Sequence, residues 1–228
     1  MAQAKKAMSK IRGKADMAEL WLDHIRDLDI GNLLKNKPLP VICVCKRPNE
    51  KGLFKGSWPD VADILLTASR NGAEYIDLPF DMPKNLNKKC VQMVKGCKSA
   101  VVDQMSNVKC QRSKVIISLH DFKNTPSVEM LVKKAMEMRK LGADIVKISV
   151  TAKTFADAVK VIILAKELEQ RKIPHIVISM GKKGILSRVL TPMLGGTIMF
   201  APLTKTKSSA PGQLTVDELR SAWSDLKT

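Results

Sequence analysis

The sequence predicts an α/β protein, a single-domain (βα)8 TIM barrel, from three observations. Short aliphatic runs alternate with amphipathic segments along the 228 residues, in units of roughly 20 to 40 residues without a linker. Most of the runs carry apolar residues on both faces, as in a parallel sheet that helices cover on both sides. No Gly-x-Gly-x-x-Gly motif follows any run, which disfavours a dinucleotide-binding doubly wound sheet.

Eight segments are candidate strands, a number that fits this barrel. Seven have a strong aliphatic pattern: Ala18–Asp23, Val41–Lys46, Tyr75–Phe80, Val115–His120, Asp144–Val150, His175–Met180 and Thr197–Ala201. The eighth, Ala100–Asp103, is weaker. Between the strands, Ser127 is a candidate N-cap and Gly142 a candidate stop of one helix, and Gly72 closes another.

Composition narrows the function classes. Hydrophobic residues make up 45% of the chain, and no apolar run approaches the ~20 residues of a membrane span, so we expect a soluble globular protein. Residues 1–14 are basic but lack the apolar core of a secretory signal. The cysteines form no Cys-x-x-Cys pair, which indicates free thiols in a reducing cytoplasm and no metal site: Cys43, Cys45, Cys90, Cys97 and Cys110.

The chain is strongly basic, with 39 Lys and Arg against 22 Asp and Glu, a formal net charge of +17. Such a charge is compatible with nucleic-acid binding. However, the lysines are spread along the whole chain, and aromatic residues make up only 4%, so no stacking platform is evident. An anionic small substrate, or merely a basic solvated surface, is the favoured interpretation.

Lys147 interrupts the aliphatic strand "DIVKISV". An inward-facing lysine in a dry barrel loses solvation of its charged form, so its pKa falls and its amine becomes nucleophilic. Such an amine forms a Schiff base with a carbonyl substrate. A lysine that reaches the rim or pairs with a carboxylate is the alternative, and the strand alone leaves both open.

His120 ends the strand in "KVIISLHDF", 27 residues before Lys147. That spacing is one strand-helix unit, so both residues are expected on adjacent strands at the catalytic end of the barrel. A lone histidine there is more simply a structural strand-end residue. Beside an amine that forms an iminium, however, an imidazole that moves protons makes a coherent catalytic pair.

Two later loops also carry candidate ligand contacts. The segment "SMGKKGILSR" joins a strand end to a helix start, so its backbone amides could bind an anion and Arg188 could hold a carboxylate bidentately. An ordinary turn with a solvated arginine is the alternative. The small-residue loop "KSSAPGQ", Lys207–Gln213, is a flexible loop and a candidate lid.

These motifs resemble type I 3-dehydroquinate dehydratases, the Schiff-base lyases of the shikimate pathway. The resemblance spans Ala15–Trp223 and follows the order of the family's motifs. "VIISLHDF" is similar to its catalytic-histidine strand and "GADIVKIS" to its Schiff-base strand. "ISMGKKGILSR" is similar to its carboxylate-arginine segment and "SAPGQ" to its closing loop.

The resemblance implies the dehydration of 3-dehydroquinate to 3-dehydroshikimate. Lys147 would condense with the C3 ketone, and His120 would take the C2 proton and assist loss of the C1 hydroxyl as water. Glu50 would orient His120. The implied substrate-binding residues are Arg188, Gln213, Ser209, Ala210, Glu19, Lys46 and Met180. The expected partner is a small molecule, without cofactor, metal or membrane, and a homodimer is left open.

The sequence departs from the family's pattern at several positions. A family arginine is Trp21 here, another is Lys46 unless Arg47 replaces it, and the loop motif Glu-Gly-Gly becomes Glu-Lys51-Gly. The usual first strand has no counterpart and is missing or replaced. We therefore expect residues 1–14 to be part of the first helix or disordered, and 15–228 to form the barrel.

Two other functions stay open. A Schiff-base aldolase on the same barrel would use the "GKKG" loop to hold a phosphate. A catalytically impaired barrel would bind a shikimate-type ligand or a partner without turnover, as the substitutions at Trp21 and Lys51 suggest.

Overall fold

The computed structural model of the protein describes residues 1–96, 113–205 and 212–226. The chain divides into two compact units, each described separately below. Unit 1 comprises Met1–Ile117 and Leu141–Ala143, and unit 2 comprises Ser118–Lys140 and Asp144–Thr228.

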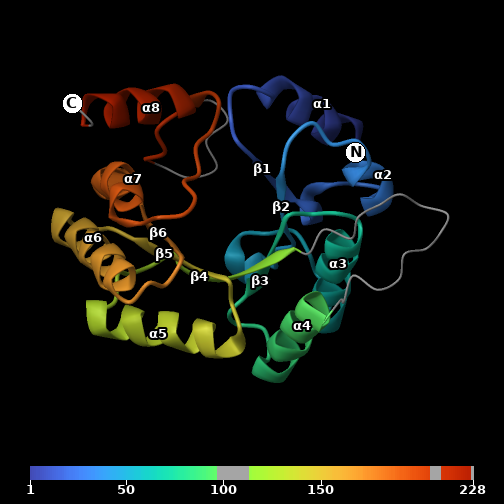
Figure 1. Ribbon diagram of the computed structural model, residues 1–228, viewed down its shortest axis with the longest axis horizontal. Helices are drawn as coiled ribbons and strands as arrows, with labels where there is room; N and C mark the ends of the chain where they lie inside the picture. Colours follow the sequence, from blue (N-terminus) through green and yellow to red (C-terminus); the bar gives the residue numbers. More distant parts are fainter. Residues whose placement is uncertain (97–112, 206–211, 227–228) are drawn as a thin grey trace. The chain divides into compact units, whose positions relative to one another are not determined.

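Unit 1 is built on parallel strands (Figure 1). The strands are β1 (Ala18–Trp21), β2 (Val41–Val44) and β3 (Tyr75–Pro79). The helices and 3-10 turns are α1 (Ala2–Ile11), η1 (Leu22–His24), α2 (Ile30–Leu34), η2 (Pro48–Glu50), α3 (Trp58–Arg70) and α4 (Lys84–Gly96). In the register, Trp21 lies opposite Val44, and Val44 lies opposite Asp77.

Local sequence explains the elements of unit 1. Every residue of β2 is buried, as expected for a strand covered on both faces. Helix α3 begins with a capping box in which the Ser57 hydroxyl accepts from the Asp60 amide and the Asp60 carboxylate accepts from the Ser57 amide. The chain leaves α3 through Gly72 at φ +87°, a conformation that glycine adopts without strain.

Unit 2 contains the remaining elements of the described chain. Strand β4 (Lys114–Asp121) begins in unit 1 and ends in unit 2. The others are α5 (Val128–Leu141), β5 (Ile145–Thr151), α6 (Phe155–Gln170), β6 (His175–Met180), η3 (Lys182–Gly184), α7 (Ile185–Leu190), η4 (Thr191–Leu194) and α8 (Val216–Asp225). Strands β5 and β6 pair in parallel, with Lys147 opposite Ile176 and Thr151 opposite Met180. In the sheet, the strands follow chain order from β1 to β6.

The structure confirms the predicted α/β fold class, with a parallel sheet and helices between the strands. The helix starting after Ser127 and the stop at Gly142, which has φ +99°, are also confirmed. The weak candidate strand Ala100–Asp103 lies outside the described residues.

The prediction of a strand at Thr197–Ala201 is wrong. Residues 197–201 form no strand; the preceding Gly196 makes an isolated bridge with His175, and the Thr197 amide donates to the His175 carbonyl at 2.8 Å. The flanking residues explain the failure, because Gly196 weakens extended pairing and Pro202 has no amide to donate. Within the segment, Thr197 is exposed and residues 198–201 are half-buried.

Several features of the described residues bear on chemistry and stability. Burial raises the pKa of the Cys43 and Cys45 thiols to about 12. Burial also lowers the pKa of His175, whose Nδ1 lies 2.9 Å from the Ile173 carbonyl oxygen. Among the described residues, no helix is both long and apolar enough to cross a membrane.

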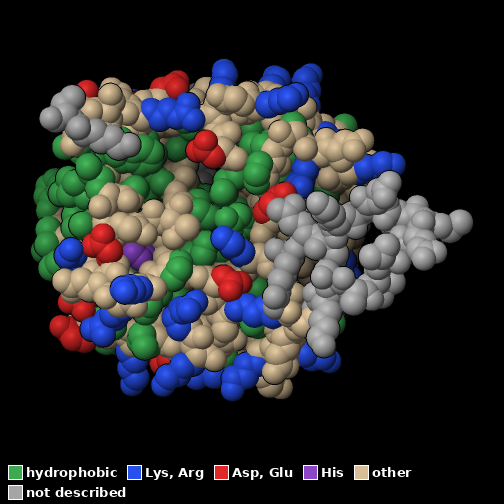
Figure 2. Space-filling model, viewed as in Figure 1, with side chains coloured by type: hydrophobic (Ala, Val, Ile, Leu, Met, Phe, Trp, Pro, Cys, Tyr) green, Lys and Arg blue, Asp and Glu red, His purple; other side chains and the backbone are tan. Residues whose placement is uncertain are grey.

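Basic side chains are scattered on the face shown in Figure 2, where acidic and uncharged side chains separate them. This view gives the +17 charge no single location among the described residues of that face. The expectation that nucleic acid is not a partner stays a prediction.

Candidate active site

Lys147 lies in the middle of β5, in unit 2, and is only 5% exposed. Its strand neighbours Val146 and Ile148 are fully buried, and their side chains project to the opposite face of β5. The Nζ atom lies 4.3 Å from the centroid of the Phe200 ring. A cation over an aromatic face is attracted by the ring's quadrupole, so Phe200 holds the amine in place.

His120 lies near the C-terminal end of β4, on the strand next to β5 in the sheet order. The C-terminal ends of the two strands are bonded together: the Thr151 hydroxyl donates to the Asp121 carbonyl at 2.9 Å. The half-buried imidazole of His120 stacks on Phe122, with ring centroids 5.8 Å apart. The predicted pair therefore lies on adjacent strands of unit 2.

Arg188 is a buried cation of α7, only 2% exposed. Burial lowers the pKa of its guanidinium to about 10. Its Nε and Nη1 atoms have no hydrogen-bond partner among the described residues. A buried guanidinium with unsatisfied donors is costly unless an anion pairs with it, so this geometry suits a carboxylate ligand.

The turn before α7 fixes the position of Arg188. The Ser187 hydroxyl donates to the Gly184 carbonyl at 2.8 Å and accepts from the Ser179 amide at 3.0 Å. A Cβ atom on Gly184 would overlap the carbonyl of Ser179, so only glycine fits there. These contacts fasten the start of α7 to the end of β6, where Met180 lies half-buried.

The closing loop also meets this turn. A Cβ atom on Gly212 would overlap the carbonyl of Gly181, which shows that the two backbones touch. Gln213, the next residue, is half-buried in the same unit. Two other predicted contacts of this loop, Ser209 and Ala210, lie outside the described residues.

In unit 1, Lys46 follows β2 and is buried between two carboxylates. Its Nζ atom lies 3.2 Å from Asp77 Oδ1 and 3.6 Å from Glu50 Oε1. All three side chains are at most 5% exposed. Because buried charges need partners, this group fixes Glu50 at the end of η2.

The loop after Lys46 is held by Asp23, whose carboxylate accepts from the amides of Lys46 and Leu53 at 3.0 and 2.9 Å. Within the loop, Lys51 is exposed and has φ +63°. Gly52 touches the Lys46 backbone, where a Cβ atom would overlap the carbonyl.

Comparison with known proteins identifies the family. The family profile described as Type I 3-dehydroquinase matches residues 1–228. A protein named 3-dehydroquinate dehydratase, from Desulfotalea psychrophila, is 30% identical over 221 residues, which cover 96% of this chain and 91% of the relative. The chain belongs to the type I 3-dehydroquinase family.

Other members and structures agree. The bifunctional 3-dehydroquinate dehydratase/shikimate dehydrogenase of Arabidopsis thaliana is 32% identical over 209 residues, which are 90% of this chain but only 32% of that longer protein. A crystal structure of type I 3-dehydroquinate dehydratase from Clostridium difficile has a TM-score of 0.81 at 24% identity, covering 97% of this chain and 87% of that one. The fold is that of these TIM-barrel-like dehydroquinase structures.

Trp21 stands where the resemblance places an arginine of the type I 3-dehydroquinase family. Glu19 and Trp21 are two positions apart in β1, so their side chains lie on the same face of the strand. The indole Nε1 donates to Glu19 Oε2 at 2.9 Å. An uncharged donor thus holds the Glu19 carboxylate in this chain.

The other two departures are also explained by position. Lys46, and not Arg47, is the cation buried with Asp77 and Glu50. Arg47 instead lies over Trp58, with Cζ 4.5 Å from the ring centroid. Lys51 is exposed in the left-handed conformation that the family's glycine would adopt without strain.

Two contacts of this site, of Lys46 with Asp77 and of Lys147 with Phe200, were not predicted from the sequence. Asp77 interrupts the buried strand β3, and Phe200 lies within the segment Thr197–Ala201 that was wrongly predicted as a strand. Asp77 carried a signal, because a carboxylate inside an apolar strand needs a buried partner. Phe200 carried none, since its contact with Lys147 joins segments 53 positions apart in the sequence.

Proposed function

We propose that the protein dehydrates 3-dehydroquinate to 3-dehydroshikimate, the reaction for which its relatives are named. One observation of geometry carries the proposal: the buried Arg188, with two unpartnered guanidinium nitrogens, lies in the same unit as the buried Lys147. A carboxylate that pairs with Arg188 and a ketone that reacts with Lys147 are both present in this substrate.

The proposed reaction begins at Lys147. Its amine adds to the C3 ketone and expels the ketone oxygen as water, which leaves an iminium. The iminium withdraws electrons and acidifies the C2–H bond. His120 then removes the C2 proton, and the electron pair forms the C1–C2 double bond while the C1 hydroxyl departs as water with a proton from His120. Hydrolysis of the conjugated iminium releases the enone and restores the amine.

Arg188 is assigned to the substrate carboxylate. The guanidinium can donate two parallel hydrogen bonds to a carboxylate, an arrangement that lysine cannot reproduce. We expect Arg188→Met to lower kcat/KM by about 100-fold or more, because charged hydrogen bonds to a buried group contribute strongly. Arg188→Lys is expected to recover only part of that loss.

The residues of unit 1 are assigned to supporting roles. The resemblance assigns Glu50 to orienting His120, and within unit 1 Lys46 forms a 3.6 Å ion pair with Glu50. Glu19 faces the ring hydroxyls, and Trp21 positions its carboxylate. Gln213, Met180, Ser209 and Ala210 complete the substrate contacts as the resemblance implies.

Trapping with borohydride tests the Schiff base. Reduction in the presence of 3-dehydroquinate should add the mass of the reduced ligand to the Lys147 peptide, because the iminium becomes a stable amine. Lys147→Ala should show no adduct and lose at least about three orders of magnitude in kcat/KM. Lys153→Ala, at an exposed lysine beyond β5, is the matched control and should keep both properties. Binding of the substrate without any adduct would refute the mechanism.

An ultraviolet assay separates turnover from mere binding. The product has a conjugated enone that the substrate lacks, so absorbance should rise with time. A protein that binds 3-dehydroquinate but never forms the chromophore would be the non-catalytic barrel that the Trp21 substitution suggests.

A further inference from the structure

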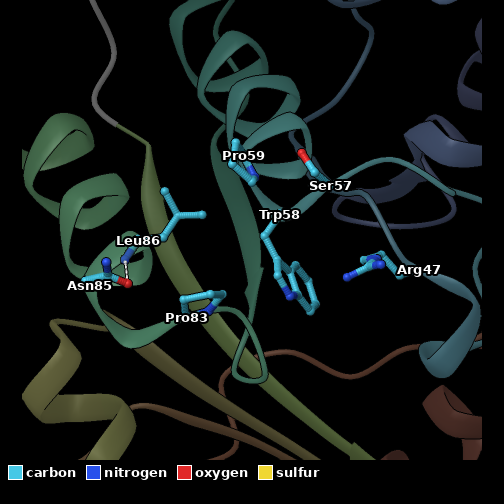
Figure 3. A pocket seen from close by; sticks show the side chains of 7 residues that line it. All are labelled: Arg47, Ser57, Trp58, Pro59, Pro83, Asn85 and Leu86. Atoms are coloured by element: carbon cyan, nitrogen blue, oxygen red, sulfur yellow. Dashed lines mark hydrogen bonds between the residues drawn. The ribbon is translucent and has the colours of Figure 1, made fainter.

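A pocket in unit 1 is lined by residues that are not assigned to catalysis. It has a volume of about 550 Å³, which is in the range of small-molecule sites. Arg47 reaches it from the loop after β2, Trp58 from the start of α3, and Leu86 from α4. Figure 3 shows the Trp58 indole between Arg47 and Pro83.

The walls of this pocket are mainly flat and apolar. Trp58 presents an aromatic ring, and Pro59, Pro83 and Leu86 add aliphatic surface. Rings of this kind bind planar apolar groups through stacking and burial. The walls therefore select a ligand with a flat ring.

Arg47 gives the pocket its charge. Its guanidinium carbon lies 4.5 Å from the Trp58 ring centroid, so the planar cation is held against the aromatic wall. The Nε atom of Arg47 is buried and has no hydrogen-bond partner among the described residues. A buried donor without a partner is unfavourable, and an incoming oxygen would satisfy it.

None of the described residues that line the pocket is acidic. Arg47 lies over one face of the Trp58 ring, so the cation and the ring wall are in contact. A ligand that fits both carries its anionic group close to its ring. An arginine fork favours a planar carboxylate, since it can donate two parallel hydrogen bonds.

We propose that this pocket is a ligand site, separate from the catalytic residues, for a small molecule with a carboxylate attached to a flat apolar ring. The pocket belongs wholly to unit 1, so the site does not depend on the proposed reaction. The backbone carbonyl of Arg47 accepts from the Glu50 and Gly52 amides at 2.9 and 3.0 Å. The same residue thus contacts the ligand and holds the loop that bears Glu50.

Nuclear magnetic resonance tests the proposal with phenylacetate as the probe. The chain has 3 tryptophans, whose indole N–H signals are assigned by single Trp→Phe variants. Phenylacetate should shift the Trp58 signal saturably and leave those of Trp21 and Trp223 in place. Phenylacetamide, the neutral isostere, should bind at least about tenfold more weakly, because it lacks the charge that Arg47 recognises.

Variants locate the probe. Arg47→Gln should weaken phenylacetate binding at least about tenfold, whereas Arg70→Gln, at the exposed arginine that ends α3, should not change it. Arg188→Met should also leave binding intact, since Arg188 belongs to the catalytic proposal. The folded indole spectrum of each variant shows that it has kept its structure.

Three outcomes would overturn the proposal. The Trp58 signal could fail to respond to millimolar phenylacetate, Arg188→Met could abolish the response, or inorganic phosphate could give the same shift as phenylacetate. The last result would show a simple anion site without selection for a ring. None of these outcomes bears on borohydride trapping at Lys147, so the two proposals fail separately.

Discussion

At the scale of single residues, the contacts of Lys46 in the structure bear on the role that the sequence predicts for it. From the sequence it is a substrate-binding candidate in place of a family arginine. In the structure its ammonium lies within 3.6 Å of both Asp77 and Glu50. These two ion pairs support the proposed role of Lys46 in holding Glu50, and its predicted contact with the substrate stays a prediction.

The ion pairs of Lys46 predict a large effect on stability. Lys46→Met would leave two buried carboxylates without their cation, so we expect the free energy of unfolding to fall by about 3–5 kcal/mol. Urea denaturation followed by circular dichroism measures the change.

Two further variants make that test specific. Lys51→Met changes the same residue type at an exposed position of the same loop and should alter stability by less than about 0.5 kcal/mol. Adding Asp77→Asn to Lys46→Met should recover part of the loss, since one buried negative charge disappears. If Lys46→Met were as stable as the parent, the buried ion pairs would have no structural role.

Some residues of the candidate site could be predicted from the sequence, but their contacts could not. Lys147 and His120 were found because their polarity interrupts aliphatic strands at a spacing of one strand-helix unit. The contacts of Lys46 with Asp77 and of Lys147 with Phe200 were not found. Side-chain direction and backbone register decide such contacts, and composition does not record either.

At the scale of elements, the helices were easier to predict than the strand ends. Helix α6 carries its own start signal, a capping box between Thr154 and Asp157. Thr197–Ala201 has the composition of a strand but not the pairing, because a strand depends on a neighbour elsewhere in the chain. Helices could therefore be predicted from local sequence signals, whereas the pairing of a strand at the sheet edge depends on tertiary structure.

The loop after β2 provides a test at this scale. Lys51 has φ +63° and ψ +18°, a left-handed conformation that is unfavourable for residues with a Cβ atom. Since its side chain is exposed, we expect Lys51→Gly to raise the free energy of unfolding by about 0.5–1 kcal/mol. Activity should stay within about twofold of the parent in the ultraviolet assay.

A control separates relief of strain from loss of the side chain. Lys51→Ala removes the side chain but keeps the Cβ atom, so it should not be stabilising. A decrease in activity for both variants would instead assign the Lys51 ammonium a role in the reaction.

At the scale of the whole molecule, the buried His175 links stability to pH. Its pKa is lowered, first by burial and against the opposing effect of the Ile173 and Leu194 carbonyls and of Glu169. The folded protein thus resists protonation that the unfolded chain accepts near pH 6.5. The contribution of His175 to stability is complete above that pH and is lost as pH falls below it.

Unfolding measured between pH 8 and pH 5 tests this linkage. The free energy of unfolding should decrease on acidification with a contribution from His175 of up to about 1.4 kcal/mol per pH unit. His175→Asn keeps a side-chain N–H donor but does not titrate, so its stability should vary less over this range. Equal slopes for both proteins would show that His175 does not govern the acid response.

The thiols of Cys43, in β2, and Cys45, directly after it, allow transient opening of this part of the protein to be measured by chemical modification. Cys43 and Cys45 are fully buried, and their pKa of about 12 leaves almost no thiolate at neutral pH. A disulfide reagent should therefore modify them only during transient exposure, at a rate set by the equilibrium population of opened molecules. Peptide mapping after timed labelling would show both cysteines reacting together, and Lys46→Met would accelerate them in proportion to its lost stability. Fast modification of the unperturbed protein would mean that this strand separates from its neighbours far more often than its burial implies.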